Sequence, residues 1–261
     1  MNITIFQVDA FTNRVFAGNP AAVCPLDEWL PDDLMQRVAL ENSVAETAFF
    51  IPRDEDFAIR WFTPEIEMDL CGHATLATAH VIARHLNKPE SPITFQSNSG
   101  TLKVTVQDKL LTLDFPSRMP LPCDAPDIIL NAFQSKPLET LKSRDYVLVY
   151  ENENLIREMQ PKQQLLDQVN LDPGGIIITA PGDDSDFVSR FFTPQASIFE
   201  DPVTGSAHCS LIPYWSKKLG KQSMQALQLS TRGGKLGCKN LDDRVLISGE
   251  AVTYFEGTIT I

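Results

Sequence analysis

The sequence predicts an α+β protein made of two similar halves, each with strands wrapped around one buried helix. The first observation behind this prediction is a repeated pattern: "RWFTPEIEMDLCGHAT" begins at Arg60 and aligns with "RFFTPQASIFEDPVTGSA", which begins at Arg190. The offset is 190 minus 60, or 130. Further on, Gly72 matches Gly205 at an offset of 205 minus 72, or 133. Matches in the same order with a nearly constant offset indicate an internal duplication.

A third match, between segments 93–104 and 227–238, continues the duplication. Each copy is predicted to contain strands, a Thr-Pro turn, a loop from an acid to a glycine, one helix, and further strands with β-branched alternation. Prolines cluster over 115–127. We therefore expect an N-terminal half of residues 1–118 and a C-terminal half of residues 119–261.

The helix that follows each glycine is the second observation. The segment 72–83 is apolar on almost every side, so it is expected to be buried, with strands around it. The corresponding helix, 205–219, is less uniform. Its Pro213 removes one backbone hydrogen bond, so we expect this helix to be kinked or shortened.

Composition excludes several classes of protein. The chain of 261 residues has 34 acidic against 22 basic side chains and a net charge of −12, which should repel nucleic acid. It has no run of eighteen apolar residues, and its start resembles neither a membrane span nor a signal peptide, so a cytoplasmic protein is expected. The five cysteines form no Cys-x-x-Cys pair, and neither a nucleotide-binding loop nor a histidine metal pattern is present. The sequence therefore predicts no metal and no cofactor.

The two glycines have a chemical interpretation as well as a structural one. A helix N-terminus has backbone N–H groups without intrahelical partners and favours an anion, and glycine allows a ligand to approach closely. Gly72 and Gly205 could thus present two helix N-termini to a small carboxylated substrate in a cleft between the halves. The alternative is that both are simple turn residues.

Four motifs in chain order then support a resemblance: "QVDAFTNRVFAGNPAAV" at 7–23, "AETAFF" at 45–50, "LCGHAT" at 70–75 and "DPVTGSA" at 201–207. Together they resemble the PhzF-like family, named for the phenazine-biosynthesis isomerase. The resemblance implies the diaminopimelate epimerase fold, in which each half is a β-barrel-like sheet around a central helix. It also implies a homodimer and a cofactor-independent shift of hydrogen on a small, amino-acid-like carboxylate.

The resemblance also implies site residues, which fall in two groups. In the N-terminal half they are the catalytic Glu46 and the substrate-contacting Gly72 and His73. In the C-terminal half they are Asp201, Gly205 and Ser206.

From the residues themselves, Glu46 lies between a polar and an apolar stretch, at the predicted start of a buried strand, where it is either an acid/base or a solvated edge residue. His73 lies in the first helical turn, where the helix dipole favours a neutral imidazole. It is either a hydrogen-bond donor or proton relay, or a core histidine like His80 and His85. Asp201 either caps its helix or orients His73 or the substrate.

Two other functions remain open at this stage. A two-base racemase or epimerase would use Cys71 with a second thiol, but Thr204 stands at the matching position and Cys209 lies one turn further on, so Cys71 is expected to be a packing residue. A non-catalytic protein that only binds a small ligand is the other alternative. The leading hypothesis is an isomerase that uses Glu46 to move a proton.

Overall fold

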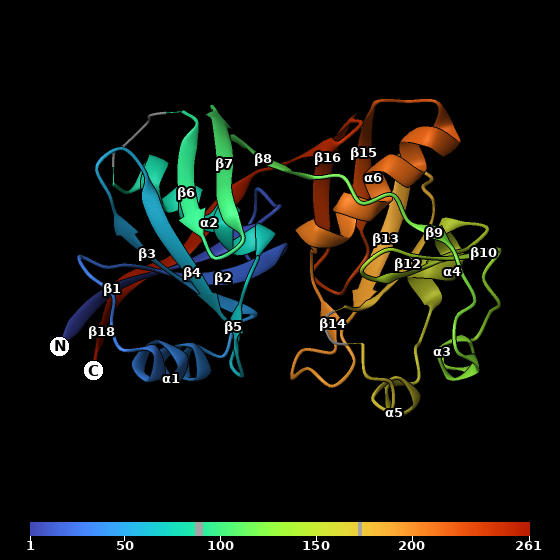
Figure 1. Ribbon diagram of the computed structural model, residues 1–261, viewed down its shortest axis with the longest axis horizontal. Helices are drawn as coiled ribbons and strands as arrows, with labels where there is room; N and C mark the ends of the chain where they lie inside the picture. Colours follow the sequence, from blue (N-terminus) through green and yellow to red (C-terminus); the bar gives the residue numbers. More distant parts are fainter. Residues whose placement is uncertain (87–90, 172–173) are drawn as a thin grey trace. The chain divides into compact units, whose positions relative to one another are not determined.

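The structure is a computed structural model that describes residues 1–86, 91–171 and 174–261 (Figure 1). It divides into two compact units. Unit 1 contains Met1–Phe115 and Ile247–Ile261, and unit 2 contains Pro116–Leu246. No helix in the described ranges has both the length and the apolar character needed to span a membrane.

The division differs from the predicted halves 1–118 and 119–261, because the chain crosses between the units twice. Strand β18 (Ala251–Thr260) pairs antiparallel with β1 (Asn2–Ala10) from Asn2↔Thr260 to Ala10↔Ala251. The last residues therefore belong to unit 1. The sequence repeat gave no sign of this return, since it contains only the segments that are duplicated.

Unit 1 places one long helix among its strands. Strand β2 (Asn19–Pro25) is parallel to β3 (Glu46–Pro52), β3 is antiparallel to β4 (Phe57–Phe62), and β4 pairs with both β5 (Glu67–Met68) and, in parallel, β6 (Ile93–Ser97). Strand β6 then pairs with β7 (Gly100–Gln107). The remaining elements are α1 (Asp32–Asn42), α2 (Gly72–Arg84), β8 (Leu110–Pro116) and β17 (Arg244–Gly249), the last of which carries the chain from unit 2 into unit 1.

Unit 2 repeats the same order of pairing. Strand β11 (Tyr146–Val149) is parallel to β12 (Ile176–Pro181), β12 is antiparallel to β13 (Phe187–Phe192), and β13 pairs with β14 (Glu200–Asp201) and, in parallel, β15 (Ser223–Gln228). Strand β15 pairs with β16 (Gly234–Leu241). The other elements are β9 (Leu121–Pro122), α3 (Asp127–Asn131), β10 (Glu139–Lys142), α4 (Glu153–Glu158), α5 (Gln163–Leu166) and α6 (Gly205–Leu219). The matching order confirms the duplication.

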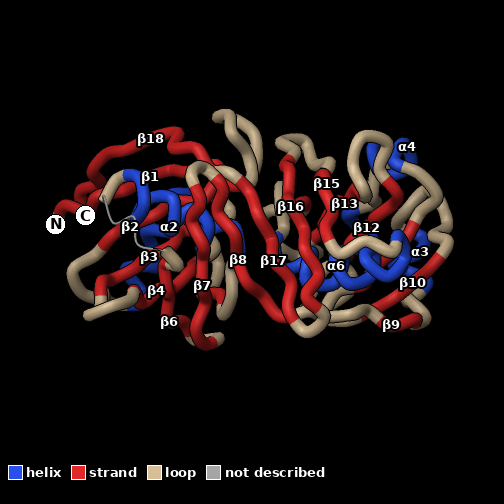
Figure 2. Tube along the Cα trace, turned by 90° about the horizontal axis from the view of Figure 1, so that it is seen from above, coloured by secondary structure: helices blue, strands red, loops and turns tan. Residues whose placement is uncertain are grey.

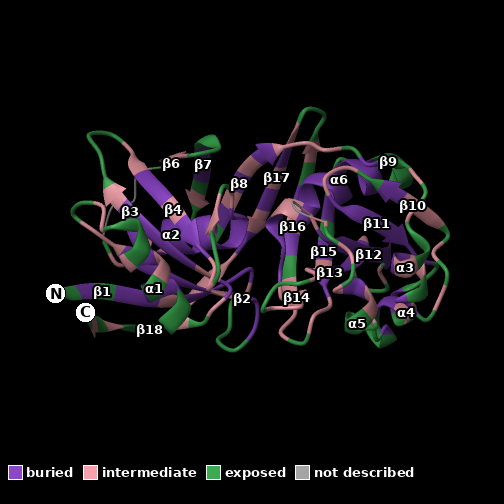
Figure 3. Cartoon of the chain, turned by 60° about the horizontal axis from the view of Figure 1, so that its bottom comes forward, coloured by how far each residue is buried: buried purple, intermediate pink, exposed green. Residues whose placement is uncertain are grey.

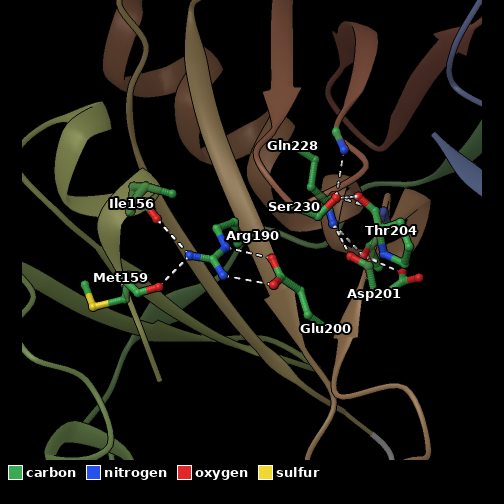
Figure 4. A network of polar contacts seen from close by, with 10 residues as sticks. Ile156, Met159, Arg190, Glu200, Asp201, Thr204, Gln228 and Ser230 are labelled. Carbon is green, nitrogen blue, oxygen red and sulfur yellow. Dashed lines mark hydrogen bonds and ion pairs between the residues drawn. The ribbon is translucent and has the colours of Figure 1, made fainter. Parts of the chain in front are cut away.

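The repeated Arg-aromatic-Phe-Thr-Pro pattern builds the same ion pair in both units. Arg60 reaches Glu67 through Nε and Nη2, each 2.6 Å from a carboxylate oxygen. Arg190 reaches Glu200 in the same way, at 2.7 and 2.9 Å (Figure 4). Such bidentate pairs fix geometry as well as charge. The first ion pair joins β4 to β5, and the second joins β13 to β14. In each unit the second, short strand leads into the central helix.

The central helices are buried, as the sequence predicts. Helix α2 contacts β1, β2, β3, β7 and β18, and its residues from Gly72 to Ala79 are all buried (Figures 2 and 3). Two of these are threonines, and each hydroxyl donates to a backbone carbonyl one turn earlier: Thr75 to Cys71 at 2.5 Å and Thr78 to Ala74 at 2.7 Å. No hydroxyl in this part of the helix is thus buried without an acceptor.

Helix α6 is not shortened by Pro213, which was one of the two effects predicted. It runs for 15 residues through the proline. Pro213 has no N–H to donate to the carbonyl of Cys209, four residues earlier. That carbonyl instead accepts a hydrogen bond of 2.8 Å from the backbone N–H of Arg118, in the segment just after β8. The lost helical bond is therefore replaced from outside the helix, which sequence alone could not reveal.

Candidate active site

The candidate site of unit 1 is built where two strands begin beside the N-terminus of α2. Glu46 is the first residue of β3 and Asn19 the first of β2, and the two strands are parallel, with Ala21 opposite Glu46. Cys71 is the N-cap of α2, so His73 is its second helical residue. Parallel pairing brings the starts of both strands to one edge of the sheet, and the helix begins at that edge.

His73 contacts three polar side chains. Its Nε2 lies 3.1 Å from Oε2 of Glu46, while its Nδ1 lies 3.2 Å from Nδ2 of Asn19 and 3.6 Å from Sγ of Cys71. The whole residue is 4% exposed and the Glu46 side chain 16%. Although Nε2 and Oε2 are close, neither makes a well-aligned hydrogen bond. Catalytic contacts often have this loose geometry before substrate binds.

The charge of His73 differs from the sequence-based expectation of a neutral imidazole. Burial by itself would lower the pKa of His73, but the negative charges that Cys71 and Glu46 can carry, and hydrogen bonds to the same two side chains, raise it well above 6.5. Burial raises the pKa of the Cys71 thiol, and the Glu46 charge adds to this effect. The side chains of Cys71 and Glu46 thus favour the protonated imidazole at this position, against the effect of burial.

The other two histidines of α2 lie away from this cluster. The hydroxyl of Thr253 is 3.0 Å from Nε2 of His80 and 2.7 Å from Nε2 of His85. Both rings therefore have a partner, in agreement with the structural role predicted for them. They are half-buried rather than fully buried.

In unit 2, Asp201 orders the loop that leads into α6. It is the last residue of β14, and its Oδ2 accepts a hydrogen bond of 2.5 Å from the hydroxyl of Thr204, the N-cap residue (Figure 4). The Thr204 side chain makes no capping bond to the helix. Asp201 thus holds the N-cap side chain, which differs from the direct capping role considered from the sequence.

Gln228, which the sequence analysis missed, fixes the same loop. It is 1% exposed at the end of β15. Its Oε1 accepts from the Thr204 N–H at 2.9 Å, and its Nε2 donates to the Asp201 carbonyl at 2.8 Å and to the Thr204 hydroxyl at 3.1 Å (Figure 4). Ser230 adds a bond of 2.8 Å to the Pro202 carbonyl. The sequence did contain a signal for Gln228, because it is a polar residue on the side of β15 that alternation places toward the core.

The duplication relates the two loops residue by residue. Phe62 and Phe192 occupy the same place in the repeated pattern, and they pair with Thr47 and Ile176, respectively. Gly175, one residue before Ile176, therefore stands where Glu46 does, and unit 2 has no acid at that place.

Asn19 and Arg144 each contact the second residue of a central helix. Asn19 contacts His73, the second residue of α2, and Arg144 donates at 3.1 Å to Ser206, the second residue of α6. Arg144 is a second residue that the sequence analysis missed.

The structure therefore brings the predicted site residues together in two groups. Glu46, Gly72 and His73 lie in unit 1, with Gly72 opening α2. Asp201, Gly205 and Ser206 lie in unit 2, with Gly205 opening α6.

The fold is that of the epimerase-like proteins. A hydroxyproline epimerase from Agrobacterium vitis, solved with trans-4-hydroxy-L-proline bound, superposes with a TM-score of 0.64, covering 99% of this chain and 91% of the other at 11% identity. Within this class the chain belongs to the PhzC-PhzF family of phenazine biosynthesis-like proteins, whose pattern it matches over residues 8–257.

Closer relatives span the full chain. A protein of Pseudomonas aeruginosa, described as an uncharacterized isomerase, is 47% identical over 259 residues and covers 99% of both chains. A crystal structure of a PhzF-family protein from Enterococcus faecalis has a TM-score of 0.95 at 43% identity and covers both chains completely.

Proposed function

We propose that this protein is a cofactor-independent isomerase that moves a proton on a small, carboxylated, amino-acid-like metabolite. The main support is the buried pair of Glu46 and His73, with Oε2 and Nε2 3.1 Å apart and neither atom committed to a hydrogen bond. The description of a 47% identical relative as an isomerase supports the same reaction class.

In this mechanism Glu46 is the acid/base. Its carboxylate takes a proton from a carbon of the substrate as the C–H bond breaks, and the electron pair moves into the adjacent unsaturated system. Glu46 then returns a proton to a different carbon, so no electrons are gained or lost overall. The His73 imidazolium stabilises the carboxylate before the transfer and donates a hydrogen bond throughout.

The substrate carboxylate is proposed to bind near the helix N-termini. The first N–H groups of a helix have no intrahelical acceptors and favour an anion, and Gly72 at the first position of α2 leaves room for one. In unit 2 we propose that Gly205 and Ser206 bind substrate in the same way, with Arg144 orienting the Ser206 hydroxyl and Asp201 ordering the loop.

The test is solvent exchange. Incubating the protein with a panel of small unsaturated or amino carboxylates in D2O should place deuterium in at least one of them. Glu46→Gln keeps the size of the side chain but cannot accept the proton, so the exchange rate should fall by about 10² to 10⁴-fold. The matched control is Glu55→Gln, an exposed acid of the same unit, which should exchange at the parent rate. A Glu46→Gln protein that also exchanges at the parent rate would show that the base lies elsewhere.

A two-base mechanism with Cys71 is the second candidate, because its Sγ lies 3.6 Å from the His73 ring and not in a purely apolar environment. The raised pKa of the Cys71 thiol opposes this role, since a base must first be a thiolate. Cys71→Ser separates the two mechanisms. Retained exchange supports Glu46 alone, whereas loss of exchange in a folded variant supports the thiol.

A further inference from the structure

Unit 1 brings three metal-binding side chains to one place. Glu46, Cys71 and His73 each offer one ligand atom within 4.8 Å of the other two. Among the described residues no other group of three or more histidine, cysteine or acidic side chains is close enough to hold an ion. The spacing Cys-x-His with a distant glutamate resembles no sequence signature of a metal site, so only the fold reveals it.

The three ligand atoms, one from each residue, lie within 4.8 Å of one another. Zinc binds sulfur at about 2.3 Å and nitrogen or oxygen at about 2.0–2.2 Å, which places ligand atoms roughly 3.3–3.7 Å apart. In the cluster, Nε2 of His73 is 3.1 Å from the Glu46 carboxylate, whereas the Cys71 sulfur faces Nδ1 at 3.6 Å. One ring nitrogen would hold the ion, so the ligand that now faces the other nitrogen has to rotate toward it.

The surroundings also suit a bound ion. His73 and Cys71 are 4% and 6% exposed, so an ion there would be largely shielded from water. Two atoms of the cluster, Nε2 of His73 and Oε2 of Glu46, are buried and make no hydrogen bond, although they lie 3.1 Å from each other. Thiolate, imidazole and carboxylate together are a donor set that favours zinc over magnesium or calcium.

We propose that Glu46, Cys71 and His73 bind one Zn²⁺ ion, and that this ion inhibits the protein by occupying the acid/base. Metal binding requires the Cys71 thiolate and a neutral His73 nitrogen, so any proton on either ligand atom is released to solvent, and three protein ligands leave the fourth position to water or another small ligand. The binding site stands on the geometry of the three side chains alone. Only the inhibition rests on the proposed function.

The first experiment titrates the metal-free full chain with Zn²⁺ by calorimetry and with Co²⁺ by absorption spectroscopy. We expect one equivalent to bind and Co²⁺ to give a thiolate-to-metal charge-transfer band. Cys71→Ser should abolish the band and weaken Zn²⁺ binding by more than the roughly 10- to 100-fold that the loss of a supporting residue causes. Cys123→Ser is the control, because Cys123 is a half-buried thiol of unit 2, and it should behave like the parent. Equal binding by the parent and Cys71→Ser would overturn the proposal.

A second experiment uses the parent protein alone, so its result does not depend on whether a variant folds. X-ray absorption of the parent protein with one equivalent of Zn²⁺ should show one sulfur at about 2.3 Å and nitrogen or oxygen ligands at about 2.0–2.2 Å. A shell without sulfur, or no binding at micromolar Zn²⁺, overturns the site. Zinc bound with one sulfur but without effect on solvent exchange would uphold the site and count against Glu46 as the base.

Discussion

Replacing Gln228 by Met tests whether one buried amide holds the loop before α6. Methionine has a similar length but cannot form the three hydrogen bonds that Gln228 makes with Thr204 and Asp201. At about 1 kcal/mol for each bond, their loss should lower the free energy of unfolding by about 3 kcal/mol. With a urea dependence of roughly 2–3 kcal/mol/M, the unfolding midpoint should fall by about 1–1.5 M.

The matched control is Gln225→Met. Gln225 lies on the same strand, three residues earlier, but its side chain is exposed, so the midpoint should change little. A second readout is local: hydrogen exchange over residues 200–206 should quicken in Gln228→Met, because the Thr204 N–H loses its acceptor. If both variants shift the midpoint equally and leave that exchange unchanged, Gln228 does not hold the loop.

Three further predictions concern charges. The raised pKa of His73 means that the folded chain holds this proton more tightly than the unfolded chain does, so the stabilisation is complete below about pH 6.5 and is lost as pH rises. His73→Gln should therefore flatten the decline of the urea midpoint above pH 6.5, and an unchanged decline would contradict the assignment. Burial lowers the pKa of His208 to about 4, so the unfolded chain binds the proton first and stability should fall between about pH 6.5 and 4, by about 3 kcal/mol. His208→Gln should remove that loss, and a variant as acid-sensitive as the parent would refute it. Arg190→Met should lower the free energy of unfolding by about 3–5 kcal/mol, because it leaves Glu200 and the carbonyls of Ile156 and Met159 without their partner. The loss should exceed that of Arg60→Met, because the partners of Arg60 are more exposed. Equal urea midpoints for these two variants would be the contrary result.

Much of the fold could be predicted from the sequence because the patterns that specify it lie within short segments and occur in both copies of the duplication. The Arg-aromatic-Phe-Thr-Pro pattern recurs because each copy builds the same strand and the same bidentate ion pair. The position of both central helices followed from a glycine and an apolar run, and each helix begins at that glycine. Pro213 does not shorten its helix, and the missing bond is supplied by the Arg118 N–H, which is remote in sequence.

The site was predictable only in part. Glu46 was placed at the start of a strand by its local pattern, and the structure has it there. Its contact with His73, and hence the charge of that histidine, depends on which strand edge meets the helix N-terminus. Gln228 and Arg144 were missed because each acts on a residue that is distant in the sequence, 24 positions away for Gln228 and 62 for Arg144.

The sequence by itself thus determined the duplication, the two central helices, the glycines that open them and the acid that begins β3. These features depend on periodicity and composition within short segments, where neighbouring residues decide the local structure. Only the tertiary structure decided that residues 247–261 return to unit 1 and that Cys71 joins Glu46 and His73 in one buried cluster. It also showed that Gly175 occupies in unit 2 the place that Glu46 has in unit 1. Strand pairing and burial set these contacts, and both depend on segments that are far apart in the chain.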